Sequence, residues 1–372
     1  MPLKQIVAAL VLSLAYLAPA GAQETSAASA PAVTIGVAAP LSDAQEILGR
    51  QVEAGAEAAA AAHGGQAAVR FVTADTQCSA DGGRAAAERF AKSHVRIVVG
   101  FLCTEAIEAA LPILKDAGIP TIDVGVRANR LTERRERTGN LIWRIAPRSG
   151  DEAKAVAAYL AKEWQSQPFG LIDDGSIPAR NMTDAVRRLV ADAGMQPQTV
   201  DNFRPAEEKQ FGLARRLQRT GVTRFFIAGD RPDIAVIARN AKSLGLDLTI
   251  VGGETLFDET SSDMPLPDGI VAIGPKTAFP DLKRADRKDL PEADTLLPPQ
   301  GYFGPAYAAT EIAITAASAA GKSGDDLTKV LSSETFDTAL GKIRFDAKGD
   351  SNLDLYRVFE WQGDRFASEA KG

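Results

Sequence analysis

The sequence alternates short runs of β-branched and apolar residues with alanine-rich segments whose apolar residues recur at helical spacing. Strands separated by helices of about 10–15 residues are typical of βαβ units, which need parallel strands and right-handed crossovers. The alternation begins at Thr34–Ala39 and starts afresh near Leu141–Ala146. At 372 residues, the chain is also too long for one domain of about 100–200 residues. These features predict an α/β fold of two doubly wound, parallel-sheet lobes.

The expected elements form two series and a closing segment. The expected strands are Thr34–Ala39, Val69–Ala74, Val95–Val99, Ile119–Val124, Phe169–Asp173, Thr199–Phe203, Arg224–Ala228, Thr249–Val251, Ile270–Ile273, Leu340–Phe345 and Asp354–Trp361. The expected helices are Glu46–Ala62, Asp81–Ser93, Thr104–Lys115, Asp151–Trp164, Arg180–Ala193, Glu207–Thr220, Pro232–Leu244, Tyr302–Ala320 and Asp325–Leu331. Because short elements follow the second series, we expect the chain to cross between the lobes again. Lobe 1 would comprise residues 32–145 and 274–335, and lobe 2 residues 146–273 and 336–372.

The first segment has the pattern of a secretory signal peptide. Lys4 precedes the apolar run Ile6–Leu17, and Ala20-Gly21-Ala22 forms a small-residue cleavage site. The apolar run is too short to span about 30 Å of hydrocarbon as a helix. We therefore expect cleavage after Ala22, a flexible leader at residues 23–31, and a protein exported to the periplasm.

Charge and composition exclude several classes of function. The formal net charge of −6 does not favour nucleic-acid binding, which needs clustered Lys and Arg. With two His and two Cys, the chain lacks the residues for a typical zinc site, and we expect no metal. No nucleophile elbow, zinc-protease motif or dinucleotide-binding glycine motif occurs, and Gly321-Lys322-Ser323 ends a helix-like run without the glycine turn of a phosphate loop. We expect no cofactor and no enzymatic activity.

Cys78 and Cys103 are the only cysteines. Thiols oxidise outside the cytoplasm, so export favours a disulfide between them. Two free, buried cysteines remain the alternative. A catalytic cysteine is a weaker hypothesis, since a disulfide would consume both thiols.

A binding site is better supported than a catalytic one. Ligands of open α/β sheets bind beyond the carboxyl ends of the strands, often at helix N-termini. The segment Val98–Thr104 reads as strand, turn and helix start, and the Thr104 hydroxyl with free backbone N–H groups suits a carboxylate. Alternatively, Thr104 only caps its own helix. Glu105 follows in the first helical turn, where it would repel an anion if it faced the site.

Several segments together resemble the leucine/isoleucine/valine-binding protein family, the periplasmic substrate-binding proteins of branched-chain amino acid ABC importers. The segments are Val72–Cys78, Val98–Cys103, Leu111–Ile113, Thr34–Val37, Leu244–Leu246, Gly252–Glu254 and Phe345–Asp350. The resemblance implies a type I periplasmic binding fold, with two lobes joined by three crossovers and a ligand clamped between them. It also implies a bridge between the two cysteines.

The same resemblance suggests how an α-amino acid would be held. Thr104 matches the hydroxyl that binds the ligand carboxylate, and Glu254 matches the acid that binds its ammonium group. An exposed loop position is the alternative for Glu254. The expected partners are a small amino acid or related carboxylate and an inner-membrane ABC permease, with the protein itself a monomer.

Other positions depart from the family. Arg127, two residues beyond Gly125, replaces a small hydroxyl residue and could bind a carboxylate through two parallel hydrogen bonds. Asp230 and Arg231 lie where aromatic residues commonly close over the ligand, and Leu48 lies near another expected aromatic position. These differences indicate a ligand more polar than a branched-chain amino acid.

Two further functions remain open. The same protein could be a sensor that presents its ligand-bound form to a receptor or regulator. It could also be an exported hydrolase that uses Asp75, Glu105 or Glu254 as acid–base groups.

Overall fold

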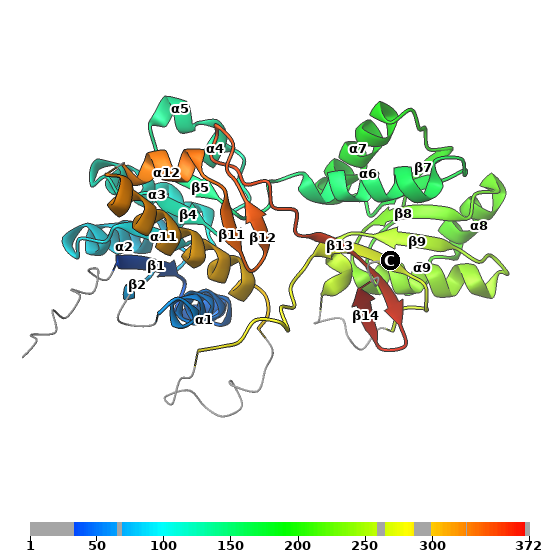
Figure 1. Ribbon diagram of the computed structural model, residues 1–372. Helices are drawn as coiled ribbons and strands as arrows, with labels where there is room; N and C mark the ends of the chain where they lie inside the picture. Colours follow the sequence, from blue (N-terminus) through cyan, green and yellow to red (C-terminus); the bar gives the residue numbers. More distant parts are fainter. Residues whose placement is uncertain (1–32, 65–68, 259–264, 286–298, 325, 369–372) are drawn as a thin grey trace, which may run out of the picture. The chain divides into compact units, whose positions relative to one another are not determined.

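A computed structural model describes residues 33–64, 69–258, 265–285, 299–324 and 326–368 (Figure 1). The expected signal peptide and leader lie outside these residues. So does Asp325, the expected first residue of the helix that begins at Leu327 (α12, Leu327–Ser333).

The first sheet contains five parallel strands in the order β2-β1-β3-β4-β5. Their bounds are β1 Val33–Ala39, β2 Val69–Asp75, β3 Ile97–Gly100, β4 Thr121–Asp123 and β5 Ile142–Arg144. Ile35 of β1 is in register with Phe71 of β2 on one side and with Ile97 of β3 on the other.

Helices cover both faces of this sheet, because successive strand residues point to opposite sides. Helices α1 (Glu46–Ala62) and α11 (Phe303–Ser323) pack on the face that carries Ile35 and Val37. Helices α2 (Ala80–Lys92) and α3 (Thr104–Asp116) pack on the other face, around Phe90 and Val98.

The second sheet has the order β14-β13-β10-β9-β8-β6-β7. Its parallel strands are β6 Gly170–Asp173, β7 Thr199–Asn202, β8 Arg224–Ala228, β9 Thr249–Gly252 and β10 Val271–Pro275. Strands β13 Tyr356–Gln362 and β14 Arg365–Ser368 add antiparallel pairs at the β10 edge. One face is covered by α6 (Asp151–Trp164) and α7 (Ile177–Asp192), and the other by α8 (Phe211–Thr220) and α9 (Arg231–Ser243).

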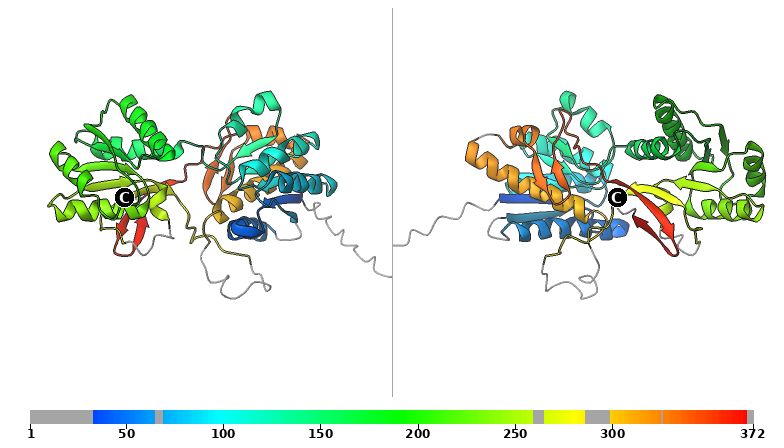
Figure 2. Two further views of the ribbon diagram at one scale, coloured as in Figure 1. Left: turned by 180° about the vertical axis from the view of Figure 1, so that it is seen from behind. Right: turned by 45° about the vertical axis from the view of Figure 1, so that its right-hand side comes forward.

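The chain passes between the two sets of elements three times: after β5, after β10 and before β13 (Figures 1 and 2). The expected fold class, two doubly wound parallel-sheet lobes joined by three connections, is confirmed.

The division of the chain into lobes remains a proposal, but one segment packs differently from the expectation. Strands β11 (Phe336–Thr338) and β12 (Gly341–Ile343) form a hairpin. The side chains of Phe336, Ile343 and Phe345 lie in the same hydrophobic core as α11 and the first sheet. Residues 336–345 therefore pack with lobe 1, whereas the sequence analysis assigned them to lobe 2. Strand β10 likewise extends to Pro275 in the second sheet, two residues beyond the expected end of that lobe segment.

Most expected elements are present, and α1, α6 and β8 have the expected bounds. Helix α8 begins at Phe211 rather than Glu207, because side chains of α9 hold the preceding segment. Asn240 Oδ1 accepts a hydrogen bond from Gln210 N at 2.7 Å, and Asp233 Oδ1 accepts one from Ala206 N at 2.9 Å. The short helices α4 (Arg130–Glu133) and α5 (Arg135–Thr138) and strand β14 were not predicted. Among the described helices, none has both the length and the apolar character needed to cross a membrane.

Candidate functional site

Both sheets contain a point at which the strand order reverses, between β1 and β3 and between β6 and β8. Ligands of such sheets bind beyond the carboxyl ends of the strands near this point. After β3 the chain makes a tight turn that requires Gly100: its φ is +126°, and a Cβ atom there would lie 2.1 Å from the Ala38 carbonyl oxygen. The turn leads directly to Thr104, the first residue of α3.

A disulfide joins this turn to the one after β2. Cys78 and Cys103 are bridged, with their Cα atoms 5.1 Å apart. The expected disulfide is confirmed, and the alternative of two free cysteines is wrong. Because Cys103 immediately precedes Thr104, the bridge fixes the backbone at the start of α3.

Thr104 is half-buried and Glu105 is exposed. The N-cap residue of α3 is Cys103, whose side chain makes no capping hydrogen bond. Thr104 thus lies inside the first turn and is not the cap of its own helix. Its hydroxyl has no hydrogen bond within the described part of the chain, which leaves it available to a ligand.

The sequence-predicted residues Arg127 and Glu254 form an ion pair. Arg127 Nη1 donates to Glu254 Oε1 at 2.7 Å, and the Tyr356 hydroxyl donates to the same oxygen at 2.6 Å. Arg127 Nη1 also lies 3.3 Å from the Tyr356 hydroxyl oxygen. The side chains of Arg127 and Glu254 are 36% and 25% exposed, so the pair is partly buried yet accessible.

Glu152, at the start of α6, fixes the backbone of Glu254. Its Oε1 accepts a hydrogen bond from Glu254 N at 2.8 Å. Gly253 makes this approach possible, since a Cβ atom there would lie 2.1 Å from the same Glu152 oxygen. Glu254 belongs to a short 3-10 helix, Glu254–Phe257, that directly follows β9 and Gly253.

The charge of Glu254 affects the pKa of three neighbouring side chains: Arg127, Glu152 and Tyr356. Burial by itself lowers the pKa of Arg127, but the hydrogen bond and charge of Glu254 outweigh it and raise that pKa above its ordinary value. Burial, together with the negative charge of Glu254, raises the pKa of Tyr356 and of Glu152. Arg127 is therefore a permanent cation, and Tyr356 is a neutral hydrogen-bond donor.

The loop that carries Arg127 is organised by Asp123 at the end of β4. Asp123 Oδ1 accepts hydrogen bonds from Gly125 N at 3.1 Å and Val126 N at 2.9 Å. Burial raises the pKa of Asp123 to about 7. Gly125 has no space for a side chain, since a Cβ atom would lie 2.5 Å from Leu102 Cδ2 and 3.0 Å from the Tyr302 ring. Residues of three loops therefore meet beside Arg127.

Apart from Gly125, five predicted site residues make no hydrogen bond or ion pair with Arg127 or Glu254 within the described residues: Leu48, Thr104, Glu105, Asp230 and Arg231. Leu48 is 38% exposed on α1, and Asp230 is exposed at the N-cap of α9. Asp230 nevertheless follows Gly229, whose carbonyl oxygen accepts a hydrogen bond from Thr255 Oγ1 at 2.7 Å. Arg231 is only 5% exposed, and its guanidinium carbon lies 4.6 Å from the centroid of the Trp361 ring. Arg231 is therefore buried against Trp361.

Four residues of the group were missed: Asp123, Glu152, Tyr302 and Tyr356. Tyr302 lies close enough to Arg127, Asp123 and Glu254 for their charges to act on it. Asp123 was detectable as a buried acid at a strand end. Glu152 and Tyr356 each lie 102 residues from Glu254, and no local pattern marks them.

The residues proposed for hydrolysis do not form an acid–base pair. In the described residues no hydrogen bond or ion pair joins Asp75, Glu105 and Glu254. Burial raises the pKa of Asp75, but hydrogen bonds, including those from the backbone N–H groups of Leu41 and Gln77, outweigh it and hold that pKa below its ordinary value. Nor do the described residues contain a cluster of three or more His, Cys, Asp or Glu side chains suited to a metal ion.

The parallel strands of the two sheets follow the same order, and the chain connects the sheets three times. Polar side chains lie at the strand ends. This arrangement is typical of proteins that bind small molecules. A family model described as periplasmic binding protein matches residues 32–366. The chain belongs to the periplasmic binding protein family. The resemblance to leucine/isoleucine/valine-binding proteins is confirmed.

Relatives and solved structures agree with this assignment. The chain is 25% identical over 300 residues, 80% of each chain, to the leucine-, isoleucine-, valine-, threonine- and alanine-binding protein of Pseudomonas aeruginosa. It is 26% identical over 345 residues, 89% of this chain and 90% of the relative, to Leu/Ile/Val-binding protein homolog 2 of Brucella abortus. A putative branched-chain amino acid ABC transporter structure from Rhodospirillum rubrum superposes with a TM-score of 0.72, 18% identity and coverage of 91% and 99%.

Proposed function

We propose that this protein is exported to the periplasm, loses its signal peptide after Ala22, and captures a small amino acid or related carboxylate. It then delivers this solute to an inner-membrane ABC permease. The names of the relatives support the ligand class, since the Pseudomonas aeruginosa protein is named for binding five small amino acids. The sequence departures at Arg127 and Asp230 favour a polar member of that class.

The ion pair between Arg127 and Glu254 carries the proposal. Each side chain has the charge that one end of a zwitterionic amino acid requires. The ligand carboxylate can replace Glu254 at the Arg127 guanidinium, while the ligand ammonium replaces Arg127 at the Glu254 carboxylate. This exchange conserves the number of charge-assisted contacts, so neither side chain is left with an uncompensated charge. Thr104 and the free N–H groups of the α3 N-terminus would complete the carboxylate site.

An aromatic carboxylate is a second candidate. A Rhodopseudomonas palustris solute-binding protein in complex with 4-hydroxybenzoate has a similar fold, with a TM-score of 0.61 at 16% identity and coverage of 91% and 95%. Arg127 would bind the carboxylate, and Tyr302 beside it would offer a ring. Such a ligand lacks an ammonium group, however, and would leave Glu254 without a cationic partner.

Melting curves of the protein comprising residues 23–372 test both candidates. The panel contains amino acids, their amides, the matching carboxylates without an amino group, and the matching amines without a carboxylate. A ligand at a thousand times its Kd adds about 4 kcal/mol to the free energy of unfolding. We expect a large shift with at least one amino acid and none with its amine or its deaminated acid.

Calorimetry of Arg127→Gln and Glu254→Gln then tests the site. Each variant removes one charge and should weaken binding by about 2–4 kcal/mol, or roughly 30- to 1000-fold. Arg130→Gln is the matched control, because it removes an exposed arginine that pairs with Glu108. A shift with deaminated acids that depends on Arg127 but not on Glu254 would support the aromatic or simple carboxylate instead. No shift with any compound would contradict the proposed ligand class.

An experiment in cells distinguishes a transport function from a sensing function. If the protein supplies a permease, deletion of its gene abolishes uptake of the ligand identified by melting curves. If it is a sensor, uptake persists and a ligand-dependent response is lost. Formation of a product from the bound ligand would instead support a hydrolase.

A further inference from the structure

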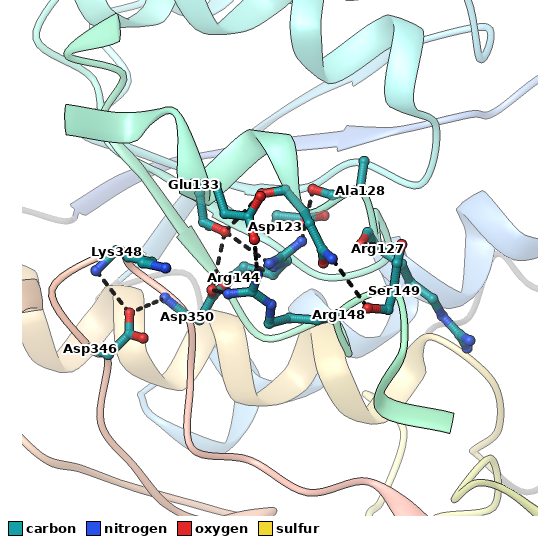
Figure 3. Close-up of polar contacts among 12 residues, drawn as sticks. Asp123, Arg127, Ala128, Glu133, Arg144, Arg148, Ser149, Asp346, Lys348 and Asp350 are labelled. Carbon is teal, nitrogen blue, oxygen red and sulfur yellow. Dashed lines mark hydrogen bonds and ion pairs between the residues drawn. The ribbon is translucent and has the colours of Figure 1, made fainter. Parts of the chain in front are cut away.

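Outside the candidate site, a network of charged and polar side chains surrounds the buried residues Arg144 and Asp350 at the end of β5. It comprises Asp350, Arg144, Arg148, Thr132 and Glu133, here called the Asp350 network (Figure 3). Arg144 has no solvent exposure and Asp350 is 7% exposed. Burying such charges costs free energy unless every group is paired, so we asked what the network does for the protein.

Asp350 is the centre of the network. Its Oδ1 accepts hydrogen bonds from Arg144 Nε at 2.8 Å and Arg144 Nη2 at 2.6 Å. Its Oδ2 accepts from Thr132 Oγ1 at 3.1 Å and also pairs with Arg148 Nη1. One carboxylate therefore holds two guanidinium groups in fixed orientations.

The network reaches the loop that carries Arg127. Arg144 Nη1 donates to the carbonyl oxygen of Ala128 at 3.0 Å. The carbonyl oxygen of Arg127 itself accepts two hydrogen bonds from Ser149, one from its N–H and one from its hydroxyl, both at 2.8 Å. Figure 3 shows the Arg127 side chain leading away from the network, so the network holds the backbone and leaves the guanidinium free to pair elsewhere.

The same residues join two of the three connections between the sheets. Arg144, Arg148 and Ser149 belong to the end of β5 and the connection that follows it, whereas Asp350 belongs to the connection before β13. Backbone hydrogen bonds run parallel to the ion pairs: Arg144 N donates to Gly349 O at 2.8 Å, and Ser351 N donates to Arg144 O at 3.0 Å. Any movement of these connections must therefore act on the Asp350 network.

We propose that Asp350 is a positioning residue for the ligand-binding guanidinium of Arg127, and that it acts through Arg148, which immediately precedes Ser149. Asp350 holds the Arg127 backbone in place and couples it to the connections between the sheets. The role of Arg127 in binding rests on the proposed function. The coupling itself belongs to the ligand-free protein and can be measured without a ligand.

The test uses Arg148→Gln, because Arg148 is 23% exposed and its loss leaves Arg144 paired with Asp350. Asp350→Asn is a second variant, but it leaves a fully buried arginine without a counter-charge and could prevent folding. Arg148→Lys keeps the charge, and Arg130→Gln is the control for losing an ion pair on the neighbouring surface. The readouts are amide hydrogen exchange and the NMR signals of the Arg127 guanidinium, assigned by their loss in Arg127→Gln.

In Arg148→Gln we expect amides of residues 125–129 and 146–151 to exchange about 10-fold faster, with β8 unchanged. The Arg127 guanidinium signals should move toward those of exposed arginines. Arg148→Lys should restore both readouts, and Arg130→Gln should change neither. Unchanged Arg127 signals in Arg148→Gln would overturn the proposal, even if the exchange near residue 148 rises, since the network would then only stabilise the fold. Failure of the ligand panel contradicts the proposed function and leaves this result intact.

Discussion

Glu152 accepts a hydrogen bond from the backbone N–H of Glu254 at 2.8 Å, so that one carboxylate fixes the backbone from which another projects. Two like charges are thereby held close together, and burial and the charge of Glu254 together raise the pKa of Glu152. The cationic Arg127 offsets part of this repulsion. This arrangement orients Glu254 toward Arg127 and Tyr356 rather than toward solvent.

Two substitutions of Glu152 separate its negative charge from its hydrogen bond to Glu254 N. Glu152→Gln keeps an acceptor oxygen for Glu254 N and should leave amino-acid affinity within about 3-fold of the wild type. Glu152→Ala removes the acceptor and should weaken binding about 10-fold, near the 1–1.5 kcal/mol of one hydrogen bond. Isothermal titration calorimetry with the ligand from the melting panel measures both. Equal affinities for the two variants would contradict a positioning role for Glu152.

Tyr356→Phe removes only the hydroxyl that donates to Glu254 at 2.6 Å. Its ring stays in β13, so the fold should persist. We expect an amino-acid ligand to bind 5- to 20-fold more weakly, because the hydroxyl orients a carboxylate and hydrogen bonds to charged groups contribute about 1.5–3 kcal/mol at most. Tyr307→Phe, in α11, is the control. An unchanged Kd in Tyr356→Phe would show that the ligand does not depend on this contact.

Asp123 predicts a pH dependence of stability. Its pKa rises from 3.8 to about 7 on folding, mainly because of burial, and its Oδ2 has no hydrogen-bond partner within the described residues. Below pH 4 this carboxyl is protonated in both states, and its favourable contribution is fully present. As the pH rises from about 4 through 7 that contribution is lost progressively, by about 4 kcal/mol at most.

Denaturant unfolding between pH 4 and 8 measures this loss of stability. Asp123→Asn keeps an acceptor for Gly125 N and Val126 N but cannot ionise, so its profile should be flatter than that of the wild type. Asp116→Asn, at an exposed position in α3, should leave the profile unchanged. Parallel profiles of Asp123→Asn and the wild type would mean that Asp123 does not titrate in this range.

Reduction of the Cys78–Cys103 disulfide should lower thermal stability. The bridge closes a loop with a sequence separation of 25, worth about 3 kcal/mol in the chain-entropy model. We expect the Tm to fall by roughly 5 °C on reduction. The double variant Cys78→Ser, Cys103→Ser should melt with the reduced wild type. An identical Tm for oxidised and reduced protein would contradict the stabilising role.

Periodicity in the sequence was sufficient to predict both sheets and most helices, because each βαβ unit is specified by residues close together in the chain. The alanine-rich helix at Glu46–Ala62 is an example, with bounds as expected. The sequence analysis assigned residues 336–345 to lobe 2, since their apolar residues fit either core by pattern alone. Only packing of Phe336 and Phe345 against α11 decided between them.

By itself the sequence determined the fold class, the disulfide and the two charged residues at the centre of the candidate site. Arg127 and Glu254 were singled out separately by the resemblance to the leucine/isoleucine/valine-binding family, Glu254 as a match and Arg127 as a departure. The tertiary structure alone decided that they pair with each other, that Glu152 and Tyr356 join them, and that Arg231 instead stacks on Trp361. These contacts join residues about 100 or more positions apart. No local propensity encodes such contacts, since they depend on where the sheets bring the ends of distant strands.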